Sequence, residues 1–207
     1  MADKGSNWRD QPSVIHPITS AIERIDVRGL FTNDGPIELE LGCGDGSFLT
    51  KYADANPDIN FIGVERLMGR LKKLDRHARR TGMTNMVLLR LEASYLLRYL
   101  LPPRTFNAIH VYFPDPWPKE KHHKNRLIND DFTERCRELL TVDGRVYLRT
   151  DHVEYFAQME EVFGRNRTFS RIDTPDDLKQ ITTDFEREFN AEGIPTNHSA
   201  WQLTEPV

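Results

Sequence analysis

The sequence predicts a doubly wound α/β domain, in which helices cover both faces of a mostly parallel sheet. Two observations predict this class. First, from residue 37 onward, short apolar segments of strand length alternate with longer segments of helical period. Second, turns that contain glycine or proline separate these segments. Parallel neighbours need crossover connections, which are usually helices. The length of 207 residues suits one such domain.

The first half of the chain provides three strands and two helices in alternation. Residues 37–41 alternate between apolar and acidic side chains, and a glycine-rich turn leads from them to a helix at residues 47–55. An Asn-Pro pair ends that helix before a strand at residues 60–64. Leucines recur at helical spacing over residues 67–81, where a glycine ends the helix, and residues 87–91 form the third strand.

The second half continues the alternation. A helix at residues 95–101 stops at two prolines, and residues 108–113 form a buried strand. A helix capped by Asn129 or Asp130 runs to Leu140, and a strand at residues 145–150 follows an Asp-Gly turn. The remaining predicted elements are a helix at residues 153–163 and a strand at residues 168–172. The last 30 residues show no clear pattern.

We expect residues 14–207 to form this single domain, because no repeat, low-complexity tract or flexible linker interrupts them. Residues 1–13 are expected to be a flexible polar arm. The arm contains no apolar segment of signal-peptide length, and no run approaches the roughly 20 apolar residues of a membrane span. The expected location is therefore the cytoplasm, without membrane contact.

Charge is unevenly distributed along the chain. The net charge of -4 argues against a strongly basic nucleic-acid coat protein. Residues 66–80, however, contain seven basic residues and one acid, whereas residues 173–192 contain seven acids and two bases. A second basic cluster consists of Lys119, Lys121, Lys124 and Arg126. The basic segments are either a surface that attracts a polyanion or ordinary solvated faces.

Neither cysteines nor histidines predict a metal site. Cys43 and Cys136 are far apart and belong to no Cys-x-x-Cys pair, which also argues against a disulfide framework. His122 and His123 are adjacent and have no partner cysteines.

Polar residues follow the first three strands, where ligands of doubly wound sheets bind. The first strand leads into Glu40-x-Gly42-x-Gly44-x-Gly46, and this spacing fits S-adenosylmethionine better than the pyrophosphate of a dinucleotide. Glu65 suits the ribose hydroxyls of either cofactor, and Glu92 suits an adenine amino group. Each feature alone is also explained as a tight turn or a surface carboxylate. Their joint order favours a nucleotide-like cofactor.

The fourth strand ends in Phe-Pro-Asp-Pro-Trp-Pro-Lys. Prolines on both sides hold Asp115 in a restricted loop at the predicted cleft. Trp117 is either an aromatic face for a nucleobase or a core residue. Lys119 suits a phosphate contact.

These motifs resemble the bacterial tRNA (guanine-N7)-methyltransferases that modify guanosine 46 in the variable loop. The resemblance extends from about residue 37 to residue 193. The motifs that carry it are Glu40-Leu41-Gly42-x-Gly44-x-Gly46, Gly63-Val64-Glu65, Phe113-Pro114-Asp115-Pro116-Trp117-Pro118-Lys119, Leu148-Arg149-Thr150-Asp151 and Thr183-Asp184-Phe185-Glu186. The resemblance implies a Rossmann-like class I S-adenosylmethionine-dependent methyltransferase fold with a seven-stranded sheet. It further implies a tRNA substrate, no metal, no obligate protein partner, and a monomer or homodimer.

The resemblance also implies roles for individual residues. Asp115 matches the proposed catalytic residue of the family. The positions that match methyl-donor binding are Glu40, Gly42, Gly44, Gly46, Glu65, Glu92 and Asp115. The positions that match tRNA binding are Lys119, Asp151, Thr183, Asp184, Phe185 and Glu186.

The sequence departs from the family pattern at three places. Glu92 stands where aspartate is common, Glu188 stands where arginine is usual, and residues 194–198 differ from the usual ending. Three alternative functions stay open: a methyltransferase for exocyclic base amines, a dinucleotide-dependent oxidoreductase, and a non-catalytic RNA-binding module. The first uses an Asp/Asn-Pro-Pro-aromatic loop, whereas only one proline follows Asp115.

Overall fold

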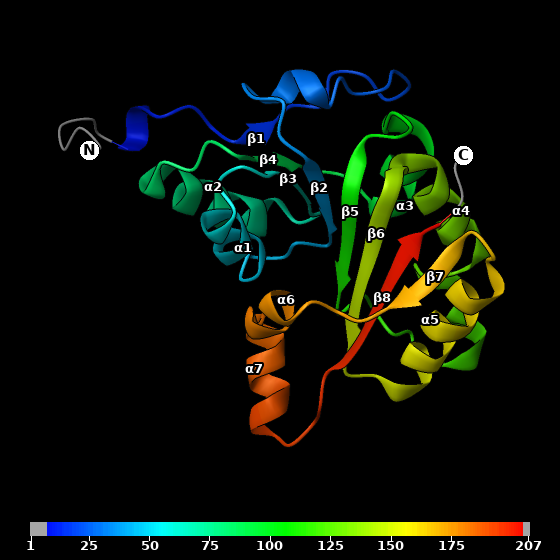
Figure 1. Ribbon diagram of the computed structural model, residues 1–207. Helices are drawn as coiled ribbons and strands as arrows, with labels where there is room; N and C mark the ends of the chain where they lie inside the picture. The colour runs from blue at the N-terminus through cyan, green and yellow to red at the C-terminus, as the bar shows by residue number, and fades with distance from the viewer. Residues whose placement is uncertain (1–7, 205–207) are drawn as a thin grey trace.

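The structure is a computed structural model and describes residues 8–204 (Figure 1). Its centre is an eight-stranded sheet with the order β1-β4-β3-β2-β5-β6-β8-β7. All pairings from β1 to β6 are parallel, and β8 alone runs against its two neighbours. The strands are β1 Ile15–His16, β2 Ile37–Leu41, β3 Asn60–Val64, β4 Met86–Leu89, β5 Phe106–Tyr112, β6 Leu140–Thr150, β7 Phe169–Ile172 and β8 Asn197–Leu203.

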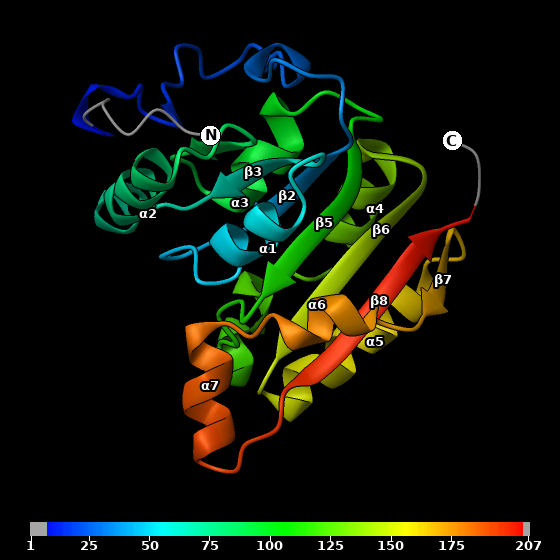
Figure 2. The ribbon, with the colours of Figure 1, turned by 60° about the vertical axis from the view of Figure 1, so that its left-hand side comes forward.

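Helices cover both faces of the sheet, which confirms the predicted doubly wound α/β class (Figure 2). The helices are α1 Leu49–Ala55, α2 Met68–Thr81, α3 Ala93–Tyr95, α4 Asp130–Leu139, α5 Val153–Arg165, α6 Asp176–Gln180 and α7 Asp184–Ala191. Leu39 of β2 belongs to an apolar cluster that contains Phe132 of α4 and Tyr155 of α5. A second cluster joins Leu49 of α1 and Leu71 of α2 to the sheet.

The sheet has one strand more than the seven expected. β1 is only two residues long and pairs with Leu88 and Leu89 of β4 at the edge of the sheet. Such a short strand gives no alternation that a sequence pattern would reveal. The count of seven was therefore wrong by an edge strand, while the class was right.

The Asp-Gly turn expected before the strand at residues 145–150 lies inside β6. β6 begins at Leu140, and its pairing with β5 skips from Leu140 to Arg145. Asp143 has a φ of 61°. The turn residues thus form an irregularity within one long strand, because the chain re-enters the same pairing after them.

The carboxyl-terminal segment, in which no clear sequence pattern was recognised, forms α6, α7 and β8. α6 and α7 lie at the carboxyl ends of the parallel strands (Figure 1). β8 then returns between β6 and β7 and pairs with both (Figure 2). This path brings α7 to the end of the sheet where the predicted site residues lie.

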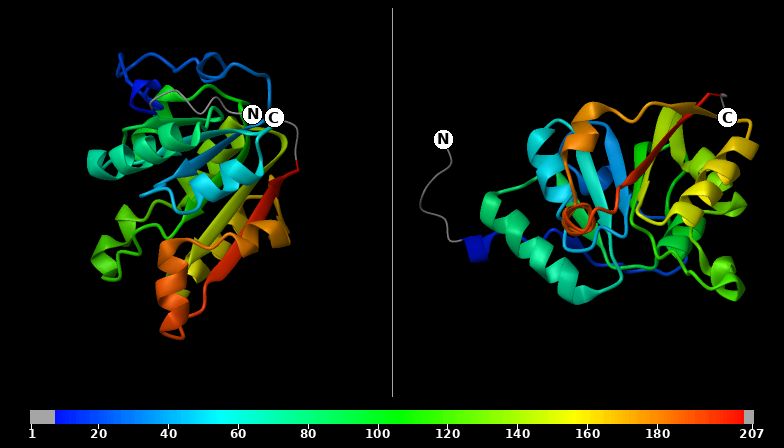
Figure 3. Two further views of the ribbon diagram at one scale, coloured as in Figure 1. Left: turned by 90° about the vertical axis from the view of Figure 1, so that its left-hand side faces the viewer. Right: turned by 90° about the horizontal axis from the view of Figure 1, so that it is seen from below.

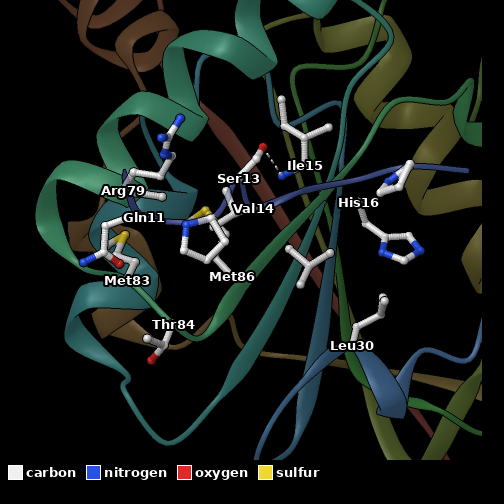
Figure 4. A pocket seen from close by; sticks show the side chains of 14 residues that line it. Gln11, Ser13, Val14, Ile15, His16, Leu30, Arg79, Met83, Thr84 and Met86 are labelled. Atoms are coloured by element: carbon white, nitrogen blue, oxygen red, sulfur yellow. Dashed lines mark hydrogen bonds between the residues drawn. The ribbon is translucent and has the colours of Figure 1, made fainter. Parts of the chain in front are cut away.

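The predicted flexible arm falls partly on residues 1–7, which lie outside the described residues. Residues 8–13 run beside α2. The guanidinium of Arg79 lies 5.7 Å from the ring centroid of Trp8, and Ser13 Oγ donates a 2.8 Å hydrogen bond to Asp75. The same segment borders a pocket at the sheet edge, which Ser13, His16 and Arg79 help to line (Figure 4). None of the predicted site residues lines that pocket.

Candidate active site

A cavity of about 540 Å³ lies at the carboxyl ends of β2, β3, β4 and β5. It is lined by Gly42, Glu65, Glu92, Asp115 and Trp117, among others. Residues from four separate strand exits therefore meet in one place, at the end of the sheet where doubly wound domains bind ligands.

The glycine turn after β2 leaves space on the cavity side and packs tightly behind it. All three glycines have positive φ, of 74°, 57° and 79° in chain order. A Cβ on Gly42 would meet nothing within 4 Å, whereas a Cβ on Gly46 would lie 2.3 Å from Leu74 of α2. Gly42 therefore lets a ligand approach the backbone, and Gly46 allows α2 to pack.

The two carboxylates after β3 and β4 are held by the backbone. Glu65 is 7% exposed and accepts a 2.7 Å hydrogen bond from the amide of Leu67. Glu92 caps α3 and accepts hydrogen bonds from the amides of Ser94 and Tyr95, at 3.0 and 2.8 Å. A carboxylate oxygen can accept a second hydrogen bond, so both side chains present fixed acceptors on the cavity wall.

Glu40 lies behind the glycine turn and does not line the cavity. It is 4% exposed, and its Oε2 has no hydrogen-bond partner. Burial raises the pKa of Glu40 to about 8, the nearby Arg149 opposes this rise, and Asp45 adds to it. A buried carboxyl oxygen without a partner is costly, and a ligand with a donor group would satisfy it.

The loop that carries Asp115 is braced from beneath by Arg126. The Arg126 side chain is 1% exposed and donates a 2.8 Å hydrogen bond to the carbonyl of Pro116. Its other nitrogens donate to Gln158 at 2.6 Å and to Glu154 at 3.1 Å. The expectation that Arg126 belongs with Lys119, Lys121 and Lys124 to an exposed basic cluster was therefore wrong. The sequence did not reveal this role, because an arginine that follows three nearby lysines is typical of a surface segment.

Asp115 and Trp117 both face solvent at the cavity mouth. The Asp115 carboxylate has no hydrogen bond or ion pair with residues 8–204. Trp117 is 37% exposed, and its ring lies edge-on to the ring of His122, with 5.9 Å between the ring centroids. This exposure rules out the core interpretation of Trp117 and leaves its ring free to contact a base.

The Thr183–Glu186 segment starts α7, and its members divide into buried and exposed side chains. Thr183 and Glu186 form a capping box, in which each side chain bonds the other residue's backbone amide. Glu186 is 2% exposed and accepts a 2.8 Å hydrogen bond from Arg149. Phe185 points outward, is 48% exposed and lies 6.3 Å from Phe113 between ring centroids.

Arg149 joins α7 to the sheet and was not singled out as an anchor from the sequence. It is 1% exposed. Besides Glu186, its guanidinium donates hydrogen bonds to the carbonyls of Leu178 and Ile181 and lies 4.2 Å from the ring centroid of Tyr112. The remaining predicted residues do not line the cavity: Lys119 is exposed at the end of the Asp115 loop, and Asp151 is half-buried just beyond β6.

Residues 8–204 contain no cluster of three or more histidine, cysteine, aspartate or glutamate side chains that could hold a metal ion. Within the same range, no helix is long and apolar enough to cross a bilayer.

Comparison with known proteins connects this geometry with methyl transfer. Residues 34–199 match the family model described as "Putative methyltransferase". A tRNA (guanine-N(7)-)-methyltransferase of Marinobacter nauticus is 34% identical over 86% of this chain and 76% of its own length. The enzyme of the same name from Lactobacillus helveticus is 33% identical over 84% of this chain and 83% of its own. The 16S rRNA methyltransferase KamB shares the fold, with a TM-score of 0.65 and 14% identity over 88% of this chain and 95% of KamB.

Proposed function

Because this chain belongs to the family of the tRNA (guanine-N(7)-)-methyltransferases, we propose that it methylates N7 of guanosine 46 in the variable loop of tRNA, with S-adenosylmethionine as donor. The observation that carries the proposal is the cavity in which Gly42, Glu65, Glu92 and Asp115 meet. We further propose that the enzyme acts in the cytoplasm, where its substrate is found, as a monomer or homodimer without an obligate partner.

The residues around the glycine turn fit the donor. Glu65 would accept hydrogen bonds from the ribose hydroxyls of the bound donor, and Glu92 would accept one from its adenine amino group. Gly42 leaves room for the donor against the backbone. The unpartnered Oε2 of Glu40 supports an acceptor role toward the cationic amino-acid end. S-adenosylmethionine supplies an electrophilic sulfonium methyl group and leaves as S-adenosylhomocysteine.

Asp115 is proposed to orient and polarise the guanine. N7 carries an in-plane lone pair, so the base attacks without prior deprotonation, and the purine becomes positively charged as the N7–methyl bond forms. A carboxylate that accepts hydrogen bonds from the N1–H and amino edge stabilises that charge, by about a few kcal/mol. Arg126 holds the loop in place, which favours a fixed approach of the base to the donor.

The predicted tRNA-binding residues contribute in two ways. Lys119 is exposed beyond the Asp115 loop and suits a phosphate contact, and Phe185 presents an exposed ring beside that loop. Asp151 and Asp184 flank the same end of the sheet. Thr183 and Glu186 are buried, and we propose that they act by holding α7 in position.

One assay tests the proposal against its alternatives. The purified protein is incubated with unmodified bulk tRNA and labelled S-adenosylmethionine, and the product nucleoside is identified by mass spectrometry. We expect 7-methylguanosine at position 46. A product methylated on an exocyclic amine would instead indicate the first alternative. Calorimetric binding of NAD(H) but not S-adenosylmethionine would indicate an oxidoreductase, and binding of neither would indicate an RNA-binding module.

The Asp115→Asn substitution tests the catalytic assignment. We expect turnover to fall by about 10²–10³-fold, the usual effect of removing one transition-state contact. The melting temperature should stay unchanged, because the Asp115 carboxylate bonds nothing within the described chain. Asp58→Asn, at another exposed loop aspartate, is the matched control. Turnover within twofold of wild type in Asp115→Asn would contradict the role.

A further inference from the structure

The exposed face of α2 carries only positive charge. The single acid of the helix, Asp75, is turned inward and is 7% exposed. Its Oδ1 accepts hydrogen bonds from Ser13 Oγ and from the amide of Val14, both at 2.8 Å. Leu71, Leu74 and Ala78 complete the buried face. No acid therefore remains on the outer face to neutralise its lysines and arginines.

The cations of α2 divide into paired and unpaired groups. Arg70 lies 3.6 Å from Glu65, Lys73 lies 2.8 Å from Asp45, and Arg79 lies 3.6 Å from Asp75. The unpaired group, which has no carboxylate partner within residues 8–204, consists of Lys72, Arg76 and Arg80.

Lys72, Arg76 and Arg80 follow one another at intervals of four residues. Residues at this spacing share a helix face, and with a rise of 1.5 Å per residue they stand about 6 Å apart along the axis. We call these three residues the α2 stripe. The helix runs along the outside of the molecule, so the stripe is open to a large ligand (Figure 3).

Other surface helices of the protein show a different arrangement. The arginines of α4 and α5, which are partly or fully exposed, are paired with acids of their own helix: Arg135 with Glu138, Arg137 with Glu134, and Arg165 with Glu161. The solvated faces of α4 and α5 are therefore charge-balanced. The α2 stripe differs from both, which favours a polyanionic partner over simple solvation.

The α2 stripe leads away from the candidate active site. Arg66 and Arg70, at the amino-terminal end of α2, line the same cavity as Asp115 and Trp117. A nucleic-acid strand whose target base occupies the cavity would have neighbouring phosphates within reach of α2. Regularly spaced, unpaired cations beside the cavity match the charge of such a backbone.

We propose that the α2 stripe binds the phosphate backbone of the tRNA beside the target nucleotide. This inference rests on the proposed function, which supplies the polyanion. The three side chains raise the affinity for tRNA because their binding releases counterions, and they orient the tRNA by contacting its phosphates. They take no part in the chemical step.

The test is the salt dependence of tRNA binding by the triple variant Lys72→Ala/Arg76→Ala/Arg80→Ala. Alanine preserves the helix, so the variant should fold. We expect the slope of log Kd against log salt concentration to fall by about two to three, and tRNA affinity at 0.1 M salt to fall about tenfold or more. S-adenosylmethionine affinity, and kcat at saturating tRNA, should stay within twofold of wild type.

A matched triple variant, Arg24→Ala/Arg28→Ala/Arg167→Ala, removes three exposed cations from other surfaces and should keep the wild-type slope. The inference is overturned if the stripe variant keeps that slope, or if both triple variants lose it equally. The proposed function has a separate readout, since its failure appears as absence of 7-methylguanosine with the wild-type protein, whatever the binding slopes.

Discussion

The carboxyl group of Glu40 is buried where its negative charge is poorly stabilised. Burial raises its pKa from 4.5 to about 8. In the unfolded chain the group loses its proton near pH 4.5, while the folded protein keeps it until about pH 8. Between these values the unfolded state binds fewer protons, so the free energy of unfolding decreases as the pH rises.

Glu40→Gln should remove this pH dependence. We expect the variant without ligand to gain stability over wild type progressively from pH 5 to pH 8, by on the order of a few kcal/mol, and to change little more above pH 8. Urea denaturation across this range measures the gain. Glu23→Gln, at an exposed position, should show none. An equal gain for Glu40→Gln at pH 5 and pH 8 would contradict the shifted pKa.

Individual site residues were predictable where they follow a strand directly. Glu65, Glu92 and Asp115 each come at or just beyond a parallel strand's carboxyl end, so topology alone brings them to one cavity. Arg126 and Arg149 were not predictable as anchors. Their burial depends on carbonyls and carboxylates supplied by distant segments, and no local pattern reports such partners.

At the scale of elements, α7 depends on one buried ion pair. Arg149→Met removes the arginine that neutralises the buried Glu186 and frees two carbonyls of the preceding segment. We expect a loss of about 3–5 kcal/mol in the free energy of unfolding, and a partial recovery when Glu186→Gln is added, because this second substitution removes the uncompensated buried charge. Urea denaturation of the single and double variants measures both values.

The control for this prediction lies on the same helix. Arg187 pairs with Asp184, and both side chains are about half exposed. Arg187→Ala should therefore cost less than about 1 kcal/mol. An Arg149→Met variant no less stable than Arg187→Ala would show that the buried pair does not hold α7.

The elements that could be predicted are those whose burial follows a regular period. β2, β3 and β5 are almost fully buried strands in which most residues are apolar, and the buried face of α2 has leucines at helical spacing. β8 was missed because Asn197 and His198, which begin the strand, are only partly buried and polar. The sequence predicts a helix at residues 95–101, whereas α3 ends at Tyr95. The residues that follow, Leu96–Leu100, form a π-helix, and their sequence is also typical of a helix.

At the scale of the whole molecule, the sheet depends on its last strand. A chain truncated after Ile172 lacks β8, the only partner of β7 within residues 8–204, and exposes one edge of β6. We expect this chain to lose cooperative thermal unfolding by circular dichroism. A chain that starts at residue 14 should keep it, as the predicted domain boundary requires. Cooperative melting of the chain truncated after Ile172 at the wild-type temperature would show that β8 is dispensable.

The position of β8 has a consequence for biosynthesis. β7 is completed about 25 residues before β8 begins, so at 5–20 residues per second it leaves the ribosome roughly one to five seconds before β8, its sole strand partner in the described part of the chain. During that interval the nascent chain presents the edge of β6, with its unpaired backbone N–H and C=O groups, to the surrounding solution. Chaperones that bind nascent chains would find their target there, and slowing translation across residues 173–196 should prolong their association.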